Sequence, residues 1–269
     1  MTGAQVTAIV VTYQTGPRLK ECLYVLSTDP EISTVLIVNN GNPPAMSDWL
    51  LQFADRRDHI QLIQAGGNIG FGAAVNLGAR AAGTEQILVI NPDAVLRRGS
   101  IGSMQAAAQG LKTPWIVGGR IFNTYGKEER GPRRRELTLT RVLAYALGFN
   151  LWTLEAERPP TGPVPMPVIS GAFFLTSQTS FEALNGFDES YFLHFEDVDL
   201  CKRCRDAGGS VMYDPASGAL HYGATSDVSE RQIKGHKADS FAYYLKTHTK
   251  GWFGRAVVAV ISPLIRKSN

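Results

Sequence analysis

The sequence predicts an α/β protein in which helices flank a mostly parallel central sheet. Over the first 110 residues, short β-branched runs alternate with segments of helical apolar spacing, which is the order typical of a parallel sheet. The runs end in polar turn formers, at the edge where parallel sheets bind ligands. With 44% hydrophobic and 19% charged residues, the chain of 269 residues can bury a substantial core.

The individual elements follow from apolar runs, helical spacing and turn residues. The proline-rich residues 158–167 are unsuited to a helix or a central strand, and we expect them to cross the face of the domain. We expect strands at residues 6–13, 34–38, 60–63, 86–90, 115–119, 168–176 and 211–213, and helices at 18–26, 46–54, 73–82, 100–109, 181–184 and 198–207.

Three polar clusters fall at the carboxyl ends of predicted strands. Thr12 and Tyr13 close the first strand, Asn39 opens the cluster after the second, and Asn91 and Asp93 follow the fourth. Because the carboxyl ends of parallel strands meet at one edge of a sheet, we expect a ligand site there.

Residues 191–200 place three carboxylates, Glu196, Asp197 and Asp199, directly after an aromatic run. Acids embedded among Phe and Leu lose solvation and usually serve a cation, a hydrogen-bonding substrate or a proton transfer. We therefore interpret this stretch as the catalytic centre.

The charge and the cysteines argue against several classes. A net charge of +3 is too small to indicate nucleic-acid binding. Three cysteines do not form a disulfide framework, which suits a reducing compartment, and the first residues lack the pattern of an export signal. The C-x-x-C at residues 201–204 has the spacing of one inward-packing helix face, with zinc or redox chemistry as the alternative.

Two segments each permit two interpretations. Residues 125–135 carry five Lys or Arg side chains and two acids, and form either a mobile basic loop or a surface for phosphate or anionic lipid. Residues 252–267 are apolar with aromatic and basic ends, but too short and interrupted for a membrane span. They form either an interfacial helix on an anionic membrane or a core-packing or dimer-forming segment.

The motifs that carry a family resemblance are Thr12-Tyr13, Asn39-Asn40-Gly41, residues 68–78, Asn91-Pro92-Asp93, Ser170-Gly171-Ala172, residues 195–200 and His221. In this order they resemble the family 2 glycosyltransferases of the GT-A fold, which has a Rossmann-like sheet. Within that family the sequence is most similar to rhamnosyltransferase-like members that build bacterial surface polysaccharides on lipid carriers. The resemblance covers roughly residues 6–225.

The resemblance implies a divalent cation, Mn²⁺ or Mg²⁺, at the diphosphate of a nucleotide sugar. The metal-binding D-x-D motif of the family has Asn91 in place of its first acid here, which leaves Asp93 as the expected ligand. His221 matches the histidine that completes the family's metal site. An imidazole ligand suits Mn²⁺ better than Mg²⁺.

The resemblance also divides the acids of residues 191–200 by role. Asp197 matches the base that takes a proton from the acceptor hydroxyl during inverting transfer. Glu196 is expected to orient the acceptor or tune the base. Asp199 is expected to be an acid at a helix start.

For the nucleotide, the resemblance implies contacts from the early polar residues. Asn39 stands where the family usually has Asp, and its carbonyl can still accept a hydrogen bond from a pyrimidine N–H. Asn91 is expected at ribose or phosphate, and Gly171 is expected to give close backbone access to the ligand. The glycine-rich turn lacks the G-x-G-x-x-G spacing of a dinucleotide site. The other expected nucleotide-sugar contacts are Thr12, Tyr13, Asn68, Phe71, Asn76 and Asp93, with Arg80 beside them.

Together these implications predict a metal-dependent inverting glycosyltransferase. The favoured donor is dTDP-rhamnose, and the acceptor is a polyprenyl-diphosphate-linked sugar or a growing oligosaccharide. A UDP-hexose or furanose donor is one alternative, and a catalytically impaired relative that serves as a binding or assembly partner is another. We expect a cytoplasmic protein, peripheral on the cytoplasmic face of the inner membrane, with no nucleic-acid partner and with a homodimer as an option.

The same resemblance suggests the domain organisation. Residues 1–225 are expected to form the GT-A domain, with a nucleotide-binding half at about 1–110 and an acceptor-binding, catalytic half at about 111–225. Residues 226–269 are expected to form a C-terminal helical tail, with membrane association as one option and core packing or dimerisation as the other.

Overall fold

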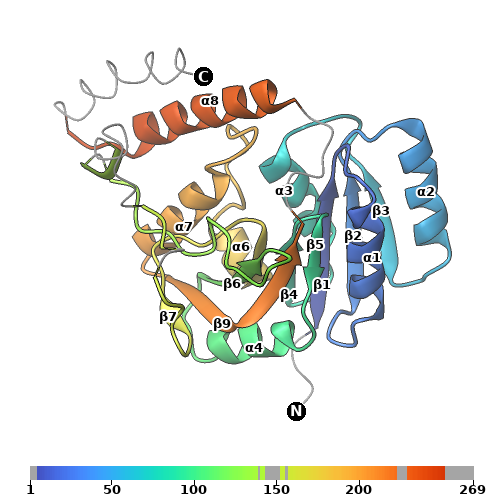
Figure 1. The fold of residues 1–269 in the computed structure, drawn as a ribbon, viewed down its shortest axis with the longest axis horizontal. Coiled ribbons are helices and arrows are strands. Elements are labelled where there is room, and N and C mark those ends of the chain that lie inside the picture. The colour runs from blue at the N-terminus through green and yellow to red at the C-terminus, as the bar shows by residue number, and fades with distance from the viewer. Residues whose placement is uncertain (1–4, 139, 143–151, 155–156, 223–228, 252–269) are drawn as a thin grey trace.

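The computed structural model describes residues 5–138, 140–142, 152–154, 157–222 and 229–251 (Figure 1). Its elements in chain order are β1 (Val6–Thr12), α1 (Arg18–Thr28), β2 (Thr34–Asn39), α2 (Pro44–Asp55), β3 (Ile60–Gln64), α3 (Phe71–Ala81), β4 (Gln86–Ile90), β5 (Ala94–Leu96), α4 (Ser100–Ala108), β6 (Trp115–Phe122), β7 (Val164–Pro165), β8 (Phe173–Ser177), α6 (Gln178–Ala183), α7 (Glu196–Asp206), β9 (Ser210–His221) and α8 (Glu230–His248).

The strands form one sheet in the order β3-β2-β1-β4-β8-β6-β9-β5, with β7 paired to β9. The first four strands run parallel, because a helix returns the chain to the starting edge of the sheet between successive strands. β8 runs antiparallel between β4 and β6, whereas β6 and β9 are parallel to each other. The predicted α/β class with a mostly parallel central sheet is confirmed.

Each face of the sheet has its own hydrophobic core. Helices α1, α2 and α4 contribute to one core, and α3, α6, α7 and α8 contribute to the other. Along β1, Val10 faces the first core while Ile9 and Val11 face the second. Burial on both faces explains why the parallel strands are continuous apolar runs in the sequence.

The strand expected at residues 168–176 begins later than predicted, at Phe173. The backbone of Val168 pairs with that of Arg134 instead, at 3.0 and 3.1 Å. The guanidinium of Arg134 also donates to the carbonyl of Ile169 at 2.8 Å. Residues 168 and 169 thus contact Arg134 instead of pairing within the sheet. The local sequence pattern of a strand does not reveal such a contact with a distant segment.

The strand expected at residues 211–213 is much longer, because β9 extends to His221. Its pairing with β6 passes from Gly119 opposite Asp214 directly to Arg120 opposite Gly218. This bulge accommodates Pro215, which looks like a strand terminator in the sequence. The extension also pairs with β5, a strand that the sequence did not predict, and brings His221 opposite Ala94.

Helix α8 packs on the loop that precedes α7 (Figure 1). The hydroxyl of Tyr243 donates to Asp188 at 3.1 Å, and that of Ser240 donates to the carbonyl of Leu193 at 2.9 Å. The ring of Phe241 stacks on that of Phe195, with 5.1 Å between the ring centroids. Within the described part of the chain, no helix combines the length and apolar character needed to cross a bilayer. The membrane or dimer segment hypothesised at residues 252–267 lies outside the described residues.

Candidate active site

Asn39 lies at the end of β2, opposite Thr12 of β1, and is buried. Its carbonyl accepts hydrogen bonds from the backbone N–H and the side-chain amide of Asn42, at 3.1 and 2.8 Å. Its own amide donates to Ser47 at 2.9 Å and to Gln64 at 2.8 Å. A pyrimidine could reach the carbonyl of Asn39 only after Asn42 moves, so the expected base contact stays a prediction.

The remaining strand-end residues differ in exposure. Thr12 is buried and its hydroxyl donates to Thr15 at 3.1 Å, whereas Tyr13 is half-buried and its hydroxyl accepts from Gln14 at 3.2 Å. Asn91 is half-buried, and its backbone N–H donates to the carbonyl of Ala172 at 2.9 Å. The end of β4 therefore adjoins the turn that contains Gly171.

The glycine-rich turn docks on the loop before the acidic motif. The N–H of Phe71 donates to the carbonyl of Phe192 at 3.0 Å. Gly70 has a φ of +89°, and a Cβ there would lie 2.7 Å from the same carbonyl oxygen, so only glycine fits. Asn68 is exposed beside this turn and accepts a hydrogen bond from Asn40 at 3.1 Å. The turn thus links the expected nucleotide wall to the loop that leads into the acidic motif.

Asn76 holds the chain together rather than presenting a free amide. Its side chain donates to the carbonyl of Phe187 at 2.9 Å and to Glu189 at 3.0 Å, and accepts the N–H of Phe187 at 2.8 Å. It also lines a hollow of about 530 Å³ beside Arg80, between α3, α6 and the loop after α6. Of the residues expected at the nucleotide sugar, Asn76 and Arg80 line this hollow, and a ribose contact by Asn76 remains only a prediction.

Asp93 and His221 meet, as the sequence predicts for a metal site. The Nε2 of His221 lies 3.2 Å from Oδ1 of Asp93, and the two side chains are 18% and 13% exposed. On the other side of the ring, Nδ1 lies 2.8 Å from Oε2 of Glu129. Burial alone disfavours the imidazolium, but the hydrogen bond and charge of Asp93, together with Glu129, prevail and raise the pKa of His221 to about 9.

The pair fits a divalent cation. A carboxylate oxygen and an imidazole nitrogen are donors that a divalent cation such as Mn²⁺ accepts. Oδ1 of Asp93 and Nε2 of His221 lie 3.2 Å apart, so both could hold one cation. Among the described residues, no group of three or more His, Cys, Asp or Glu is arranged to hold a metal.

Asp197, the expected base, lies in the first turn of α7. Its Oδ2 accepts the guanidinium of Arg134 at 2.5 Å and the N–H of Gly171 at 2.9 Å, while Oδ1 accepts the N–H of Val198 at 2.8 Å. A Cβ at Gly171 would stand 3.0 Å from Cβ of Asp197. Gly171 therefore contacts the carboxylate of Asp197 directly, by close approach and by its N–H.

Glu196 differs from Asp197 in its surroundings. Its side chain is buried, and Oε2 has no hydrogen-bond partner among the described residues. Burial, and next the charge of Asp197, raise the pKa of Glu196 to about 8. Of the two neighbouring acids, Glu196 is thus the harder to ionise, whereas Asp197 is the one that pairs with a guanidinium and accepts backbone N–H groups.

The arginine-rich segment, residues 123–135, is not merely a mobile basic surface loop, which corrects one of its two interpretations. Arg133 and Arg134 are 4% and 9% exposed. Arg133 makes a bidentate pair with buried Glu128, which also accepts the hydroxyl of Tyr213 at 2.9 Å. This anchor holds Glu129 at the Asp93 end and Arg134 at the Asp197 end of the site. Neither residue was predicted as part of the site, although the adjacent acids and arginines could have indicated internal ion pairs.

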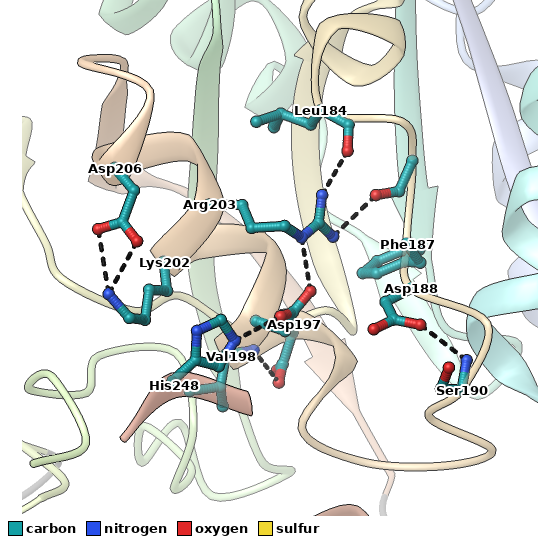
Figure 2. Close-up of polar contacts among 12 residues, drawn as sticks. Leu184, Phe187, Asp188, Ser190, Asp197, Val198, Lys202, Arg203, Asp206 and His248 are labelled. Carbon is teal, nitrogen blue, oxygen red and sulfur yellow. Dashed lines mark hydrogen bonds and ion pairs between the residues drawn. The ribbon is translucent and has the colours of Figure 1, made fainter. Parts of the chain in front are cut away.

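Asp199 lies in the first turn of α7, as expected, and it also belongs to a buried polar network. It is 1% exposed, and its two oxygens accept Arg203 and His248, both at 2.7 Å. The guanidinium of Arg203 also donates to the carbonyls of Leu184 and Gly186 (Figure 2). His248 is at the end of α8, so this network ties α8 to the helix that carries Asp197 (Figure 2).

Cys201 and Cys204 are buried free thiols that pack in the core beside α7. Burial is the first cause that raises the pKa of both thiols, to about 12 for Cys201 and about 11 for Cys204. Their spacing is thus accounted for by packing of one helix face.

A family model described as glycosyl transferase family 2 matches residues 7–184, more than half of the chain. The chain belongs to glycosyl transferase family 2. This member is 29% identical over 265 residues to an N-acetylglucosaminyl-diphospho-decaprenol L-rhamnosyltransferase from Mycobacterium tuberculosis, covering 91% of this chain and 85% of that protein. It is 24% identical to the rhamnosyltransferase WbbL from Escherichia coli over 246 residues, covering 87% and 90% of the two chains.

The fold of this family 2 glycosyltransferase also matches solved structures. It superposes on a mannosyltransferase from Pyrobaculum calidifontis in complex with GDP-Man and Mn²⁺, with a TM-score of 0.62 at 15% identity. The match covers 99% of this chain and 73% of that one. The predicted family, its rhamnosyltransferase-like character and the GT-A fold are confirmed.

Proposed function

We propose that this enzyme is an inverting rhamnosyltransferase that uses dTDP-rhamnose and a polyprenyl-diphosphate-linked sugar or growing glycan in cell-surface polysaccharide synthesis. The names of both curated relatives support rhamnose as the sugar, and one names a diphospho-decaprenol acceptor. An acceptor of this kind would place the enzyme at the cytoplasmic face of the inner membrane.

The observation that carries the proposal is the arrangement around Asp197. Arg134 and Gly171 orient Oδ2, and among the described residues Oδ1 accepts only the N–H of Val198. Oδ1 therefore retains capacity to accept the proton of an acceptor hydroxyl as that oxygen attacks the anomeric carbon. Asp197, which pairs with the guanidinium of Arg134, and not the buried Glu196, is therefore the acid proposed as the base.

Departure of the nucleoside diphosphate requires compensation of its growing charge. Asp93 and His221 would hold a divalent cation at the diphosphate, which supplies that compensation. Asn91, at the position of the family's first acid, adjoins the Gly171 turn and would contact the donor through its amide. Tyr13, the half-buried side chain at the end of β1, would flank the base.

A transferase assay with defined donors tests the proposal. Purified enzyme with Mn²⁺ or Mg²⁺ is offered dTDP-rhamnose or UDP-GlcNAc, with polyprenyl-diphosphate-GlcNAc as acceptor, and the product is examined by mass spectrometry and NMR. We expect a rhamnosylated lipid with inverted anomeric configuration from dTDP-rhamnose. Transfer from the UDP-sugar instead would overturn the donor assignment. Nucleotide binding without transfer from any donor would indicate an impaired relative, which the replacement of Asp by Asn at position 91 makes worth testing.

A further inference from the structure

The imidazole of His221 lies between two carboxylates that come from different parts of the chain. Asp93 follows β4 and faces Nε2, whereas Glu129 belongs to residues 123–135 and faces Nδ1. Nothing in the family motifs points to Glu129, because it lies beyond β6 in the arginine-rich segment.

A neutral imidazole carries one N–H and one lone pair, and the hydrogen bond on one nitrogen decides which atom is which. An N–H on Nδ1 that donates to Glu129 leaves the lone pair of Nε2 directed at the Oδ1 of Asp93. Two acceptors then face each other at 3.2 Å, and only a cation between them completes the arrangement. That cation is either a proton or a divalent metal.

The position of Glu129 is built into the fold. Its backbone N–H donates to the carbonyl of Ile121 at 2.9 Å, which fixes the residue to the end of β6. Its neighbour Glu128 is buried and bound by Arg133 and Tyr213. With both sides held, the carboxylate of Glu129 lies 2.8 Å from Nδ1 at 27% exposure.

We propose that Glu129 is a positioning residue that accepts the Nδ1–H of His221 and thereby presents Nε2, with Asp93, to the divalent cation of the donor complex. Glu129 lies on the opposite side of the ring from Asp93, so it acts through His221 and not as a ligand. Such outer partners of metal-bound histidines commonly change metal affinity by about 10–100-fold. The inference rests on the proposed metal-assisted function and deepens it.

Mn²⁺ binding in the presence of dTDP, followed by the EPR signal of free Mn²⁺, tests this without an activity measurement. Glu129→Gln should weaken Mn²⁺ binding about 10-fold or more, and Glu129→Asp should fall between the Gln variant and the unmodified protein. Glu136→Gln is the matched control, because Glu136 belongs to the stretch that follows and pairs with Arg205 at 3.2 Å. The control should bind Mn²⁺ normally.

A double-mutant cycle with His221→Gln separates positioning from a general structural role. If Glu129 acts through His221, Glu129→Gln should cause no further loss of Mn²⁺ affinity in the His221→Gln background. Unchanged Mn²⁺ binding by Glu129→Gln, or equal losses in both backgrounds, would overturn the inference and leave the proposed function intact. Absence of Mn²⁺ binding by the unmodified protein would overturn both.

Discussion

The two acids proposed for metal binding and proton transfer, Asp93 and Asp197, are nearly equally exposed, at 13% and 14%, but differ in the basic side chain that each one meets. Asp93 faces His221, which can release its proton and coordinate a metal. Asp197 faces Arg134, which stays charged at every physiological pH. At the Asp93 end, a metal cation can therefore take the place of the proton on His221. At the Asp197 end, the positive charge belongs to the Arg134 guanidinium, which orients the carboxylate of Asp197.

Both ends also depend on the same segment. Residues 123–135 supply Glu129 to His221 and Arg134 to Asp197, and the buried pair of Glu128 with Arg133 lies between them. The segment thus links the Asp93 end and the Asp197 end of the candidate site by a short stretch of chain.

The sharpest way to break the comparison is to remove the base. Asp197→Asn keeps the size of the side chain but cannot accept the acceptor's proton, so kcat should fall by about 10²- to 10⁴-fold. Affinity for dTDP with Mn²⁺, measured by calorimetry, should change little. Retention of more than a tenth of the transfer rate would refute the base assignment.

Replacing Asp93, the acid proposed to bind the metal, should affect the Asp93 end of the site. Asp93→Asn deletes one of the two protein ligands expected for the cation, so Mn²⁺ affinity and kcat/KM should fall about 100-fold or more. Calorimetric titration with Mn²⁺ and dTDP measures the binding loss directly. Unaltered Mn²⁺ affinity would show that the cation lies elsewhere.

A milder change tests the guanidinium of Arg134, which pairs with Asp197. Arg134 also donates to the carbonyl of Ile169, at 2.8 Å, and lies over the ring of Trp152 at 5.3 Å. Arg134→Lys keeps the charge but loses the planar fork, so kcat should fall about 10-fold. Mn²⁺ affinity should stay the same. A matching loss of Mn²⁺ affinity would mean that the two ends are not separable.

The last prediction concerns pH and stability instead of catalysis. Because the folded-state pKa of Glu196 is raised, to about 8 from an ordinary 4.5, its contribution to stability is complete below pH 4.5 and is lost as pH rises through 8. The free energy of unfolding should therefore fall by at most about 1.4 kcal/mol per pH unit relative to Glu196→Gln over this range. Urea titrations of both proteins from pH 5 to 9 measure the difference, and parallel pH profiles would contradict it.

The sequence predicted the parallel half of the fold well, because strands buried on both faces are unbroken apolar runs between turn residues. It predicted the meeting of Asp93 with His221 only through the family motifs, since 128 residues separate them in the chain. Arg134 and Glu129 were missed because their partners are set by tertiary contacts. Asn39 shows that tertiary contacts can also remove an expected contact. Its residue type suggested a side-chain oxygen free to bind a nucleotide base, but that oxygen already accepts a hydrogen bond from Asn42.

The central claim is that Asp93 binds the cation and Asp197 transfers the proton. Measuring Mn²⁺ affinity and transfer rate side by side for Asp93→Asn and Asp197→Asn tests it most directly. The account predicts that Asp93→Asn loses Mn²⁺ affinity and transfer together, whereas Asp197→Asn loses transfer but binds Mn²⁺ like the unmodified enzyme. Equal loss of Mn²⁺ affinity in both variants, or loss only in Asp197→Asn, would contradict it.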